Sequence, residues 1–564
     1  MKGMIIMNDK PWLPFYEAEV APTCEYPNQN LAAFLVTSAQ KFPHRPAMYF
    51  MGKSISYKKL LMLSYQMANV LRGLGVKKGD RVAIMLPNCP QVVIAYYGTL
   101  LLGGVAVMTN PLYMERELAH QMKDSGAKII ITLDTFYSRV ENIVQETEIK
   151  HTIVTGVKDY LPLIKKWLYP IKAKKEGPLP VVSYNNQVHS FTKLINSAAA
   201  DPILESVDAK EELAQLQYTG GTTGVPKGVM LTHMNLIANT IQSGNWCHRV
   251  EDGKERYLAA LPCFHVFGLT CVLNQAIYRA GLMILVPKFE VNMILNLIRK
   301  KKPTLFPGAP TMYIALINHP RIKEYDLSSI NACISGSAAL PVEVQDTFEE
   351  MTKGRLIEGY GLTEASPVTH ANPIWGRRKI GTIGIPFPDT DARVIHPETG
   401  EEMPVGEPGE LIVKGPQVMK GYWGRPEETF ETIRNGWLFT GDMATMDEEG
   451  YFTIIDRKKD MIIASGFNIY PREIEEVLYE HPSVKEAVVV GMKDSYRGES
   501  VKAYIVLKDG AKPDPASLEQ FCRSQLAAYK VPRQYVFRES LPKTMVGKVL
   551  RRKLLEEDEE QPTA

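Results

Sequence analysis

The sequence carries no excess charge of either sign. Its 564 residues include 65 Lys and Arg against 63 Asp and Glu, which gives a formal net charge of +2 at pH 7. A strong basic excess is the electrostatic footprint of many nucleic-acid-binding proteins, and this chain lacks it. Hydrophobic residues make up 45% and charged residues 23%, a composition that excludes a disordered or collagen-like chain and is typical of a large soluble enzyme.

Cysteine pairing motifs are also missing. The seven cysteines form no CxxC pair, and their odd number fits neither a disulfide framework nor a zinc knuckle. The uninterrupted run of apolar or small residues before Asn8 is only five residues long, shorter than the about 7–15 apolar residues of a secretory signal. We therefore expect free thiols in a reducing compartment and a cytoplasmic protein.

A continuous apolar run that could cross a bilayer is missing as well. No charged residue lies between Arg81 and Glu115, but Pro87, Pro90 and Gly103-Gly104 interrupt the stretch. We interpret it as a strand, a helix and a second strand. Parallel strands and their helices are covered on both faces, so a buried α/β segment explains the missing charge.

The chain predicts an α/β protein with a smaller unit toward its C-terminal end. Strand–helix–strand repetition continues in residues 114–133 and implies layered α/β subdomains. From about residue 380, short β runs separated by Gly and Pro predict a small β-barrel. The residues after the polar run 456–460 predict a compact α+β unit with a helix capped by Asp514. At roughly 100–200 residues per domain, the length predicts three to five structural units.

Residues 157–187 combine six lysines with Trp167 and Tyr169. Prolines in this segment disfavour a long helix, so we predict a solvated surface loop. The alternative is an interfacial patch that touches anionic lipid, because basic and aromatic residues together suit a membrane surface.

The segment Tyr218-Thr-Gly-Gly-Thr-Thr-Gly-Val-Pro-Lys-Gly228 has the composition of a phosphate-binding loop. Its glycines let backbone N–H groups approach a polyanion, its threonines add hydroxyl donors, and Lys227 adds a positive charge. Gly228 stands where a Walker A loop needs Ser or Thr, so a P-loop kinase is disfavoured.

Three further segments carry polar groups that are ordinary when taken singly. Leu261–Gly268 presents His265 among apolar neighbours, where a core histidine is the simpler interpretation. Glu358–Glu364 combines an aromatic ring, a hydroxyl and a carboxylate and resembles a turn. Thr440-Gly-Asp442 is followed by Asp456-Arg457, a carboxylate and a guanidinium that alone suggest surface charge.

Together and in this order, the segments resemble the adenylate-forming superfamily of acyl-CoA synthetases, luciferase-like enzymes and peptide-synthetase adenylation domains. The resemblance covers about residues 30–553 and is similar in detail to bacterial long-chain fatty-acid–CoA ligases, notably in NGWLFTGDMATMDEEGYFTIIDRKKDMIIASGFNIYPREIEEVLYEHP and in TLFPGAPTMYIAL before ISGSAALPVEV. It implies an N-terminal AMP-binding domain over residues 1–457 and a mobile C-terminal domain over residues 458–564.

The resemblance implies a two-step reaction that needs ATP, Mg²⁺ and CoA. A fatty acid, preferred over an aryl acid, first reacts with ATP to give an acyl-adenylate and pyrophosphate. The CoA thiol then attacks the adenylate and releases AMP. AMP is a much better leaving group than hydroxide, so the enzyme has to bring two anions together with positive charge and positioned donors. We expect a long-chain acid, with medium chain length as the alternative.

The resemblance also implies which residues bind the nucleotide. The loop 219–228 would hold the β- and γ-phosphates, the backbone at 336–338 would pack against adenine, and the ring of Tyr360 would stack on its other face. Asp442 would accept the ribose hydroxyls with help from Arg457. The nucleotide-binding residues expected are Thr219, Gly220, Gly221, Thr222, Thr223, Gly224, Lys227, Gly336, Ser337, Ala338, Tyr360, Gly361, Asp442 and Arg457.

Four catalytic roles follow from the same resemblance. Lys548 would bridge the carboxylate and α-phosphate oxygens, and Thr363 would contact the α-phosphate. Glu364 would be the carboxylate associated with Mg²⁺. His265 would lie where the acyl carboxylate meets the nucleotide, or would gate that position.

The C-terminal domain is expected to rotate between the two half-reactions. Lys459 aligns with the hinge, and Ser465 and Gly466 would line the CoA tunnel. One departure from the family pattern is Ser337-Ala338-Ala339, where Gly-Ala-Pro is more usual.

Several alternatives share these motifs. They are a fatty-acyl-AMP ligase that serves a carrier protein, an aryl-CoA ligase, a luciferase-like monooxygenase and a non-catalytic acyl-nucleotide sensor. A sensor predicts damaged motifs, whereas the polar residues named above are all present. Contact with the inner face of the membrane and a homodimer are left open, and no nucleic-acid partner is expected.

Overall fold

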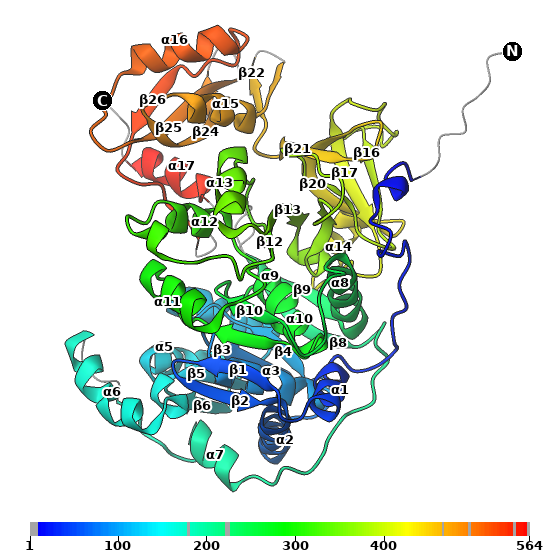
Figure 1. Cartoon of the computed structure of the whole chain (residues 1–564), viewed down its shortest axis with the longest axis vertical. Coiled ribbons are helices and arrows are strands. Elements are labelled where there is room, and N and C mark those ends of the chain that lie inside the picture. Colours follow the sequence, from blue (N-terminus) through cyan, green and yellow to red (C-terminus); the bar gives the residue numbers. More distant parts are fainter. Residues whose placement is uncertain are drawn as a thin grey trace, which may run out of the picture. The chain divides into compact units, whose positions relative to one another are not determined.

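The computed structural model describes residues 10–176, 181–219, 226–464, 467–494, 498–544 and 549–560 (Figure 1). The chain forms two compact units. The large unit contains Leu13–Asp391 and Lys414–Gly436, and the small unit contains the described parts of Met1–Trp12, Ala392–Val413 and Trp437–Ala564. The boundary expected between residues 457 and 458 stays a prediction.

An eight-stranded sheet organises the large unit. Its order is β18-β9-β8-β4-β3-β5-β6-β7, parallel from β8 to β7 and antiparallel where β9 pairs with β8 and with β18. The strands are β18 (Gly421–Tyr422), β9 (Lys227–Thr232), β8 (Leu213–Thr219), β4 (Val105–Met108), β3 (Arg81–Met85), β5 (Ile129–Leu133), β6 (His151–Thr155) and β7 (Val188–Ser190).

Two four-stranded sheets complete the large unit. One runs β10-β11-β1-β2 and the other β12-β13-β14-β15, and Leu305 bridges Tyr257 of β10 and Ala332 of β12. The strands are β10 (Arg256–Ala259), β11 (Leu282–Leu285), β1 (Pro46–Phe50), β2 (Lys53–Ser56), β12 (Ala332–Ser335), β13 (Arg355–Gly361), β14 (Val368–Ala371) and β15 (Ile385–Pro386), with the short strand β19 (Ile433–Arg434) near the end of the unit.

Helices connect and cover these sheets. They are α1 (Ala33–Lys41), α2 (Tyr57–Gly73), α3 (Pro90–Leu101), α4 (Glu115–Ser125), α5 (Tyr137–Ile143), α6 (Leu163–Glu176), α7 (Phe191–Ser197), α8 (His233–Trp246), α9 (Val266–Gly268), α10 (Gln275–Tyr278), α11 (Val291–Lys301), α12 (Pro310–Ile317), α13 (Val342–Thr352) and α14 (Pro426–Thr432). A π-helix, η5 (Leu269–Asn274), joins α9 to α10, and short 3₁₀ turns include η4 (Val157–Tyr160) and η7 (Thr363–Ala365).

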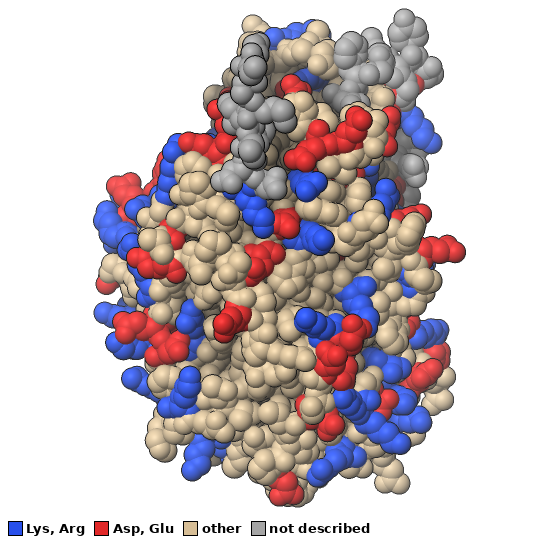
Figure 2. All heavy atoms as spheres, turned by 90° about the vertical axis from the view of Figure 1, so that its right-hand side faces the viewer, with Lys and Arg blue, Asp and Glu red and all other residues tan. Residues whose placement is uncertain are grey.

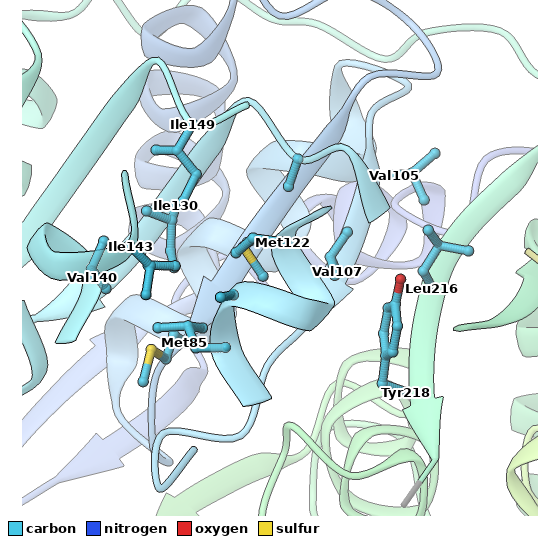
Figure 3. Packing of buried hydrophobic residues seen from close by; sticks show 14 residues of the cluster. Met85, Val105, Val107, Met122, Ile130, Val140, Ile143, Ile149, Leu216 and Tyr218 are labelled. Carbon is cyan, nitrogen blue, oxygen red and sulfur yellow. The ribbon is translucent and has the colours of Figure 1, made fainter. Parts of the chain in front are cut away.

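The charge-free stretch after Arg81 forms the predicted strand, helix and strand. Every residue of α3 and of β4 is buried. Figure 3 shows Met122 of α4 among the side chains of Val107 and Ile130, which belong to two strands of the sheet. All three residues are part of one buried apolar cluster. The predicted helix before Gly126 is α4, and Gly126 ends it in the left-handed conformation with φ of 60°.

The small unit contains two sheets. In the first, β17 pairs antiparallel with β20, and β20 with β21. In the second, the order is β23-β22-β25-β24, and β26 pairs with β25. The elements are β16 (Asp391–Ile395), β17 (Gly409–Lys414), β20 (Trp437–Met446), β21 (Phe452–Arg457), β22 (Ile462–Ala464), β23 (Phe467–Ile469), β24 (Val484–Asp494), β25 (Gly498–Leu507), β26 (Gln534–Phe537), α15 (Pro471–Glu480), α16 (Pro515–Gln525) and α17 (Arg551–Glu560). The predicted cap of α16 is present, because Asp514 accepts a hydrogen bond from the Ser517 N–H at 3.0 Å.

The lysine-rich segment is not the predicted loop. Residues Leu163–Glu176 form helix α6. Pro162 lies directly before it, where a proline costs a helix little, because the N–H that it lacks would be unpaired anyway. Pro170 is the one proline inside the helix and removes a single backbone donor. The prediction was wrong because most prolines of the segment flank the helix rather than interrupt it.

The described part of the chain has no helix suited to span a membrane. Within those residues, no helix combines the length and the hydropathy that a bilayer crossing requires. On the face drawn in Figure 2, Lys and Arg lie interspersed with Asp and Glu.

Candidate active site

The predicted phosphate loop joins two antiparallel strands of the large unit. Strand β8 ends at Thr219 and β9 begins at Lys227, and these two residues are direct partners across the ladder. Gly220, Gly221, Thr222, Thr223 and Gly224 lie outside the described residues. The hairpin thus holds both ends of the loop in register.

Lys227 and Glu364, which are far apart in the sequence, are linked through Tyr422. The Tyr422 hydroxyl donates to Oε1 of Glu364 at 2.8 Å, and Nζ of Lys227 lies 5.0 Å from the centre of the Tyr422 ring. Strands β9 and β18 bring Lys227 and Tyr422 together, and η7 supplies Glu364. The structure therefore places a cation and a carboxylate, both predicted, around one aromatic ring that was not predicted.

A second unpredicted residue, Glu428, forms an ion pair with Lys227. The hydrogen bond from Lys227 holds the pKa of the Glu428 carboxyl below its usual value. Glu428 belongs to α14, which directly follows β18. In this arrangement a carboxylate balances Lys227, so an incoming polyanion would compete with Glu428 for the ammonium group.

The carboxylate donor set suits Mg²⁺ only in combination with a phosphate ligand. In the parts of the chain that the structure describes, no three His, Cys, Asp or Glu side chains are grouped to hold a metal ion. Mg²⁺ commonly binds through one or two carboxylates together with substrate phosphates and water. Glu364, partly exposed and held by Tyr422, fits the single-carboxylate case.

The predicted adenine wall is formed by the ends of β12 and β13. The Gly336 N–H donates to the Gly308 carbonyl at 3.1 Å, and Ser337 and Ala338 follow it on the surface. Ser337 has φ of 72°, in the left-handed region that favours glycine. This conformation explains why glycine is more usual at that position in the family pattern.

Tyr360 and Gly361 are the last two residues of β13. Tyr360 is partly exposed and packs edge-on against His370 of β14 with ring centroids 6.0 Å apart. A Cβ at Gly361 would lie 2.0 Å from the Pro367 carbonyl oxygen, so a side chain is excluded there. Burial lowers the pKa of His370 to about 3, which keeps this ring neutral beside Tyr360.

His265 begins the short helix α9 and is held between two elements of the site. Its Nδ1 accepts the Phe267 N–H at 3.3 Å. The side chain of Gln217 on β8 donates to the carbonyl of the preceding residue, Phe264, at 2.9 Å. On the other side, Thr270 donates to the Ser366 carbonyl, directly after η7, at 2.7 Å. The segment that carries His265 is thus tied to β8 through Phe264 and to the turn after η7 through Thr270. The role of His265 toward the acyl carboxylate stays a prediction.

Asp442 and Arg457 lie in the small unit and form an ion pair. They are partners across β20 and β21, and Nε of Arg457 lies 3.1 Å from Oδ1 of Asp442. The Asp442 side chain is 5% exposed, whereas that of Arg457 is 36% exposed. The ion pair brings these two predicted residues together, and their contact with a ribose stays a prediction.

The remaining predicted residues concern the C-terminal half of the small unit. Lys459 is exposed in the turn between β21 and β22, where a hinge is expected. Ser465, Gly466 and Lys548 lie outside the described residues, so their roles stay predictions.

Sequence reasoning missed the ion network beside that turn. Arg551 of α17 lies 2.9 Å from Asp460, 2.7 Å from Glu475 and 3.9 Å from Asp456. Asp456 also accepts the N–H of Arg472 at 2.8 Å. These residues are distant in sequence, and no local pattern marks them as partners.

Two family models match this chain, one over its N-terminal part and one over its C-terminal part. The AMP-binding enzyme family matches residues 35–423, and the AMP-binding enzyme C-terminal domain matches residues 473–548. The chain belongs to the AMP-binding enzyme family. The predicted resemblance to adenylate-forming enzymes is therefore confirmed.

Relatives of this AMP-binding enzyme cover nearly its whole length. It is 52% identical over 556 residues to a long-chain-fatty-acid–CoA ligase of Bacillus subtilis (strain 168), an alignment that covers 98% of this chain and 99% of that protein. It is 41% identical to the Escherichia coli O6:H1 protein of the same name, over 97% of this chain and 98% of that protein.

The solved structures confirm the predicted fold class of this AMP-binding enzyme. The ATP-bound MatB structure from Rhodopseudomonas palustris superposes with a TM-score of 0.83 at 32% identity. The superposition covers 95% of this chain and 99% of the MatB chain. An α/β protein with a large N-terminal part and a smaller C-terminal part is thus the observed fold.

Proposed function

We propose that the protein is an AMP-forming fatty-acid–CoA ligase with a preference for long chains. The observation that carries the proposal is the 52% identity to a ligase of that name along almost the full chain. The geometry of Lys227, Tyr422 and Glu364 supports it, since it supplies a cation and a carboxylate beside the predicted phosphate loop. The cosubstrates are ATP and CoA.

In the first half-reaction, the residues of the large unit hold the triphosphate. The loop 219–228 and Lys227 bind the β- and γ-phosphates, and Thr363 contacts the α-phosphate. Lys548, which the proposed C-terminal domain supplies, stabilises the negative charge that develops as the carboxylate attacks. Removing one such donor commonly lowers kcat by about 10²–10³. Glu364 holds Mg²⁺, which supplies charge neutralisation at the phosphates when bound.

In the second half-reaction, we propose that residues 458–564 rotate about Lys459 as the C-terminal domain. The exposed turn that carries Lys459 lies between two sheets of the small unit, which is a suitable place for a hinge. The rotation exchanges Lys548 for Ser465 and Gly466, which line the path of the CoA thiol.

A buried cavity in the large unit is the proposed end of the acyl site. It has a volume of about 20 Å³, and its lining is mostly apolar. The lining residues are Ser243, Cys247, Tyr257, Cys271, Gln275, Leu305, Pro307, Ala332 and Ile334. This volume is on the order of one water molecule, so an acyl chain has to displace side chains to extend into it.

We also propose that the protein works in the cytoplasm, touches the inner face of the membrane and forms a homodimer. Contact with a bilayer suits an enzyme whose substrate partitions into lipid. Sedimentation velocity measures the oligomeric state directly, and a monomer at micromolar concentration would contradict the dimer.

A ladder of carboxylic acids tests the proposed function. The protein is incubated with ATP, Mg²⁺ and each acid, with and without CoA. We expect acyl-CoA only when CoA is present, with the highest kcat/KM for long fatty acids. A stable acyl-AMP that CoA does not consume would favour a fatty-acyl-AMP ligase, and turnover of aryl acids alone would favour an aryl-CoA ligase.

A further inference from the structure

Helix α6 presents an apolar face to solvent. Leu163, Ile164, Trp167 and Leu168 keep 86%, 76%, 80% and 46% of their surface exposed. At about 100° per residue, these four positions fall within an arc of about 140° on one side of the helix. A contiguous group of large exposed apolar side chains marks a surface that a partner covers.

A polar contact outside the apolar arc ties the helix to the large unit. Lys165 falls outside the apolar arc, and its Nζ donates to the Met51 carbonyl at 2.8 Å, in the turn between β1 and β2. Figure 1 shows α6 at the edge of the large unit, beyond β6 and α7. The helix is thus held through a lysine while its apolar side chains point to solvent.

The charge around this face is positive. Helix α6 contains five lysines and one acidic residue, its last residue Glu176. Of the neighbouring described lysines, Lys53, Lys158 and Lys166 are exposed. The nearest acidic group from η4, Asp159, is engaged by the Thr155 hydroxyl and the Gly156 N–H, both at 2.9 Å. The surface therefore combines exposed Trp, Leu and Ile with lysine, which complements an anionic lipid headgroup region.

We propose that α6 is the element that docks this protein on a bilayer containing anionic lipid. A 14-residue helix is about 21 Å long, shorter than the about 30 Å of a hydrocarbon core, so α6 lies in the plane of the interface. Its apolar arc enters the acyl boundary, and Lys53, Lys158 and Lys166 beside it meet the headgroups. The choice of a bilayer over another partner rests on the proposed function, since a fatty-acid substrate is available there.

Vesicle co-sedimentation of the full chain tests the docking surface. The variant Ile164→Ser/Trp167→Ser removes two apolar side chains from the arc, and Leu204→Ser/Ile380→Ser removes two that are 45% exposed elsewhere in the large unit. With phosphatidylglycerol vesicles, we expect the α6 variant to bind at least tenfold more weakly than the unchanged protein, and the control variant to bind like it. Phosphatidylcholine vesicles or high salt should also weaken binding.

Four results would overturn the proposal. The unchanged protein could fail to bind phosphatidylglycerol vesicles, the α6 variant could bind like the control, or phosphatidylcholine could be bound equally well. A fourth is a dimer that the α6 variant converts to monomer in sedimentation velocity without losing vesicle binding, because a second copy of the chain would then be the occupant.

The outcome is separable from that of the proposed function. Binding is measured without ATP or fatty acid, so it can succeed in a protein that has no ligase activity. Conversely, the α6 variant should keep full activity on a water-soluble short-chain acid and lose at least fivefold on a long-chain acid supplied in vesicles. Loss of activity on both substrates would point to misfolding, which circular dichroism of the variant detects independently.

Discussion

Arg551 is predicted to hold the C-terminal part of the small unit together. Its guanidinium lies between Asp460 and Glu475, and 26% of its side chain is exposed. Replacing it with Met keeps the length of the side chain and leaves the carboxylates without their cation. Breaking a buried pair by removing one partner costs about 3–5 kcal/mol. We take about 3 kcal/mol, because a quarter of the Arg551 side chain still meets water.

Calorimetry of the full chain measures this loss. For a unit of this size, 1 kcal/mol shifts the melting temperature by about 2–4 °C, so Arg551→Met should lower the transition of the small unit by about 6–12 °C. Arg552→Met is a matched control. Arg552 is the next residue and lies exposed. It pairs along the helix with Glu556 at 2.7 Å, an interaction of about 0.3–0.5 kcal/mol.

The pH dependence gives a sharper test of the same prediction. Burial raises the pKa of Glu475, and Arg551 opposes that rise. A carboxyl whose folded pKa is raised contributes stability that is fully present below its unfolded pKa and is lost as pH rises through its folded pKa. Without Arg551 the folded pKa rises further, so the variant should lose more stability at pH 8 than at pH 5. An equal loss at both pH values, or a loss no larger than that of Arg552→Met, would refute the reasoning.

Three further predictions concern the reaction. Lys548→Ala should abolish acyl-AMP formation, which pyrophosphate exchange measures, and should spare thioester formation from supplied acyl-AMP. Equal loss of both half-reactions would count against the catalytic role of Lys548. Lys459→Pro should slow thioester formation much more than adenylation, and normal overall turnover would contradict the hinge. Cys271→Val adds about one methyl group to the proposed acyl cavity, so kcat/KM for a sixteen-carbon acid should fall about tenfold more than for an eight-carbon acid. Cys271→Ser, which keeps the volume, should show no such chain-length dependence.

Local sequence patterns predicted much of the fold, because the burial of each helix or strand determines which residues it contains. The charge-free strand and helix after Arg81 and the glycine that ends α4 are examples. Helix α6 was missed because the composition of the segment suggested a loop, although Pro170 is its one internal proline. Its exposed apolar face, which carries the membrane proposal, follows only from the helical geometry.

The site was predictable where residues form motifs and not where single residues meet across the fold. Lys227 and Glu364 stand in recognisable segments, and the structure brings both to the ring of Tyr422. Tyr422 and Glu428 stand nearly 200 residues beyond Lys227 and carry no local signal. The partners of Arg551 were missed for the same reason, because tertiary packing alone brings them together.

The fate of the ATP phosphates tests the central claim most directly. The protein is incubated with ATP labelled at the α-phosphate, Mg²⁺, CoA and hexadecanoic acid, and the labelled products are separated. An AMP-forming ligase predicts labelled AMP in equal amount to pyrophosphate and acyl-CoA, and none without the acid. Labelled ADP as the product would contradict the account.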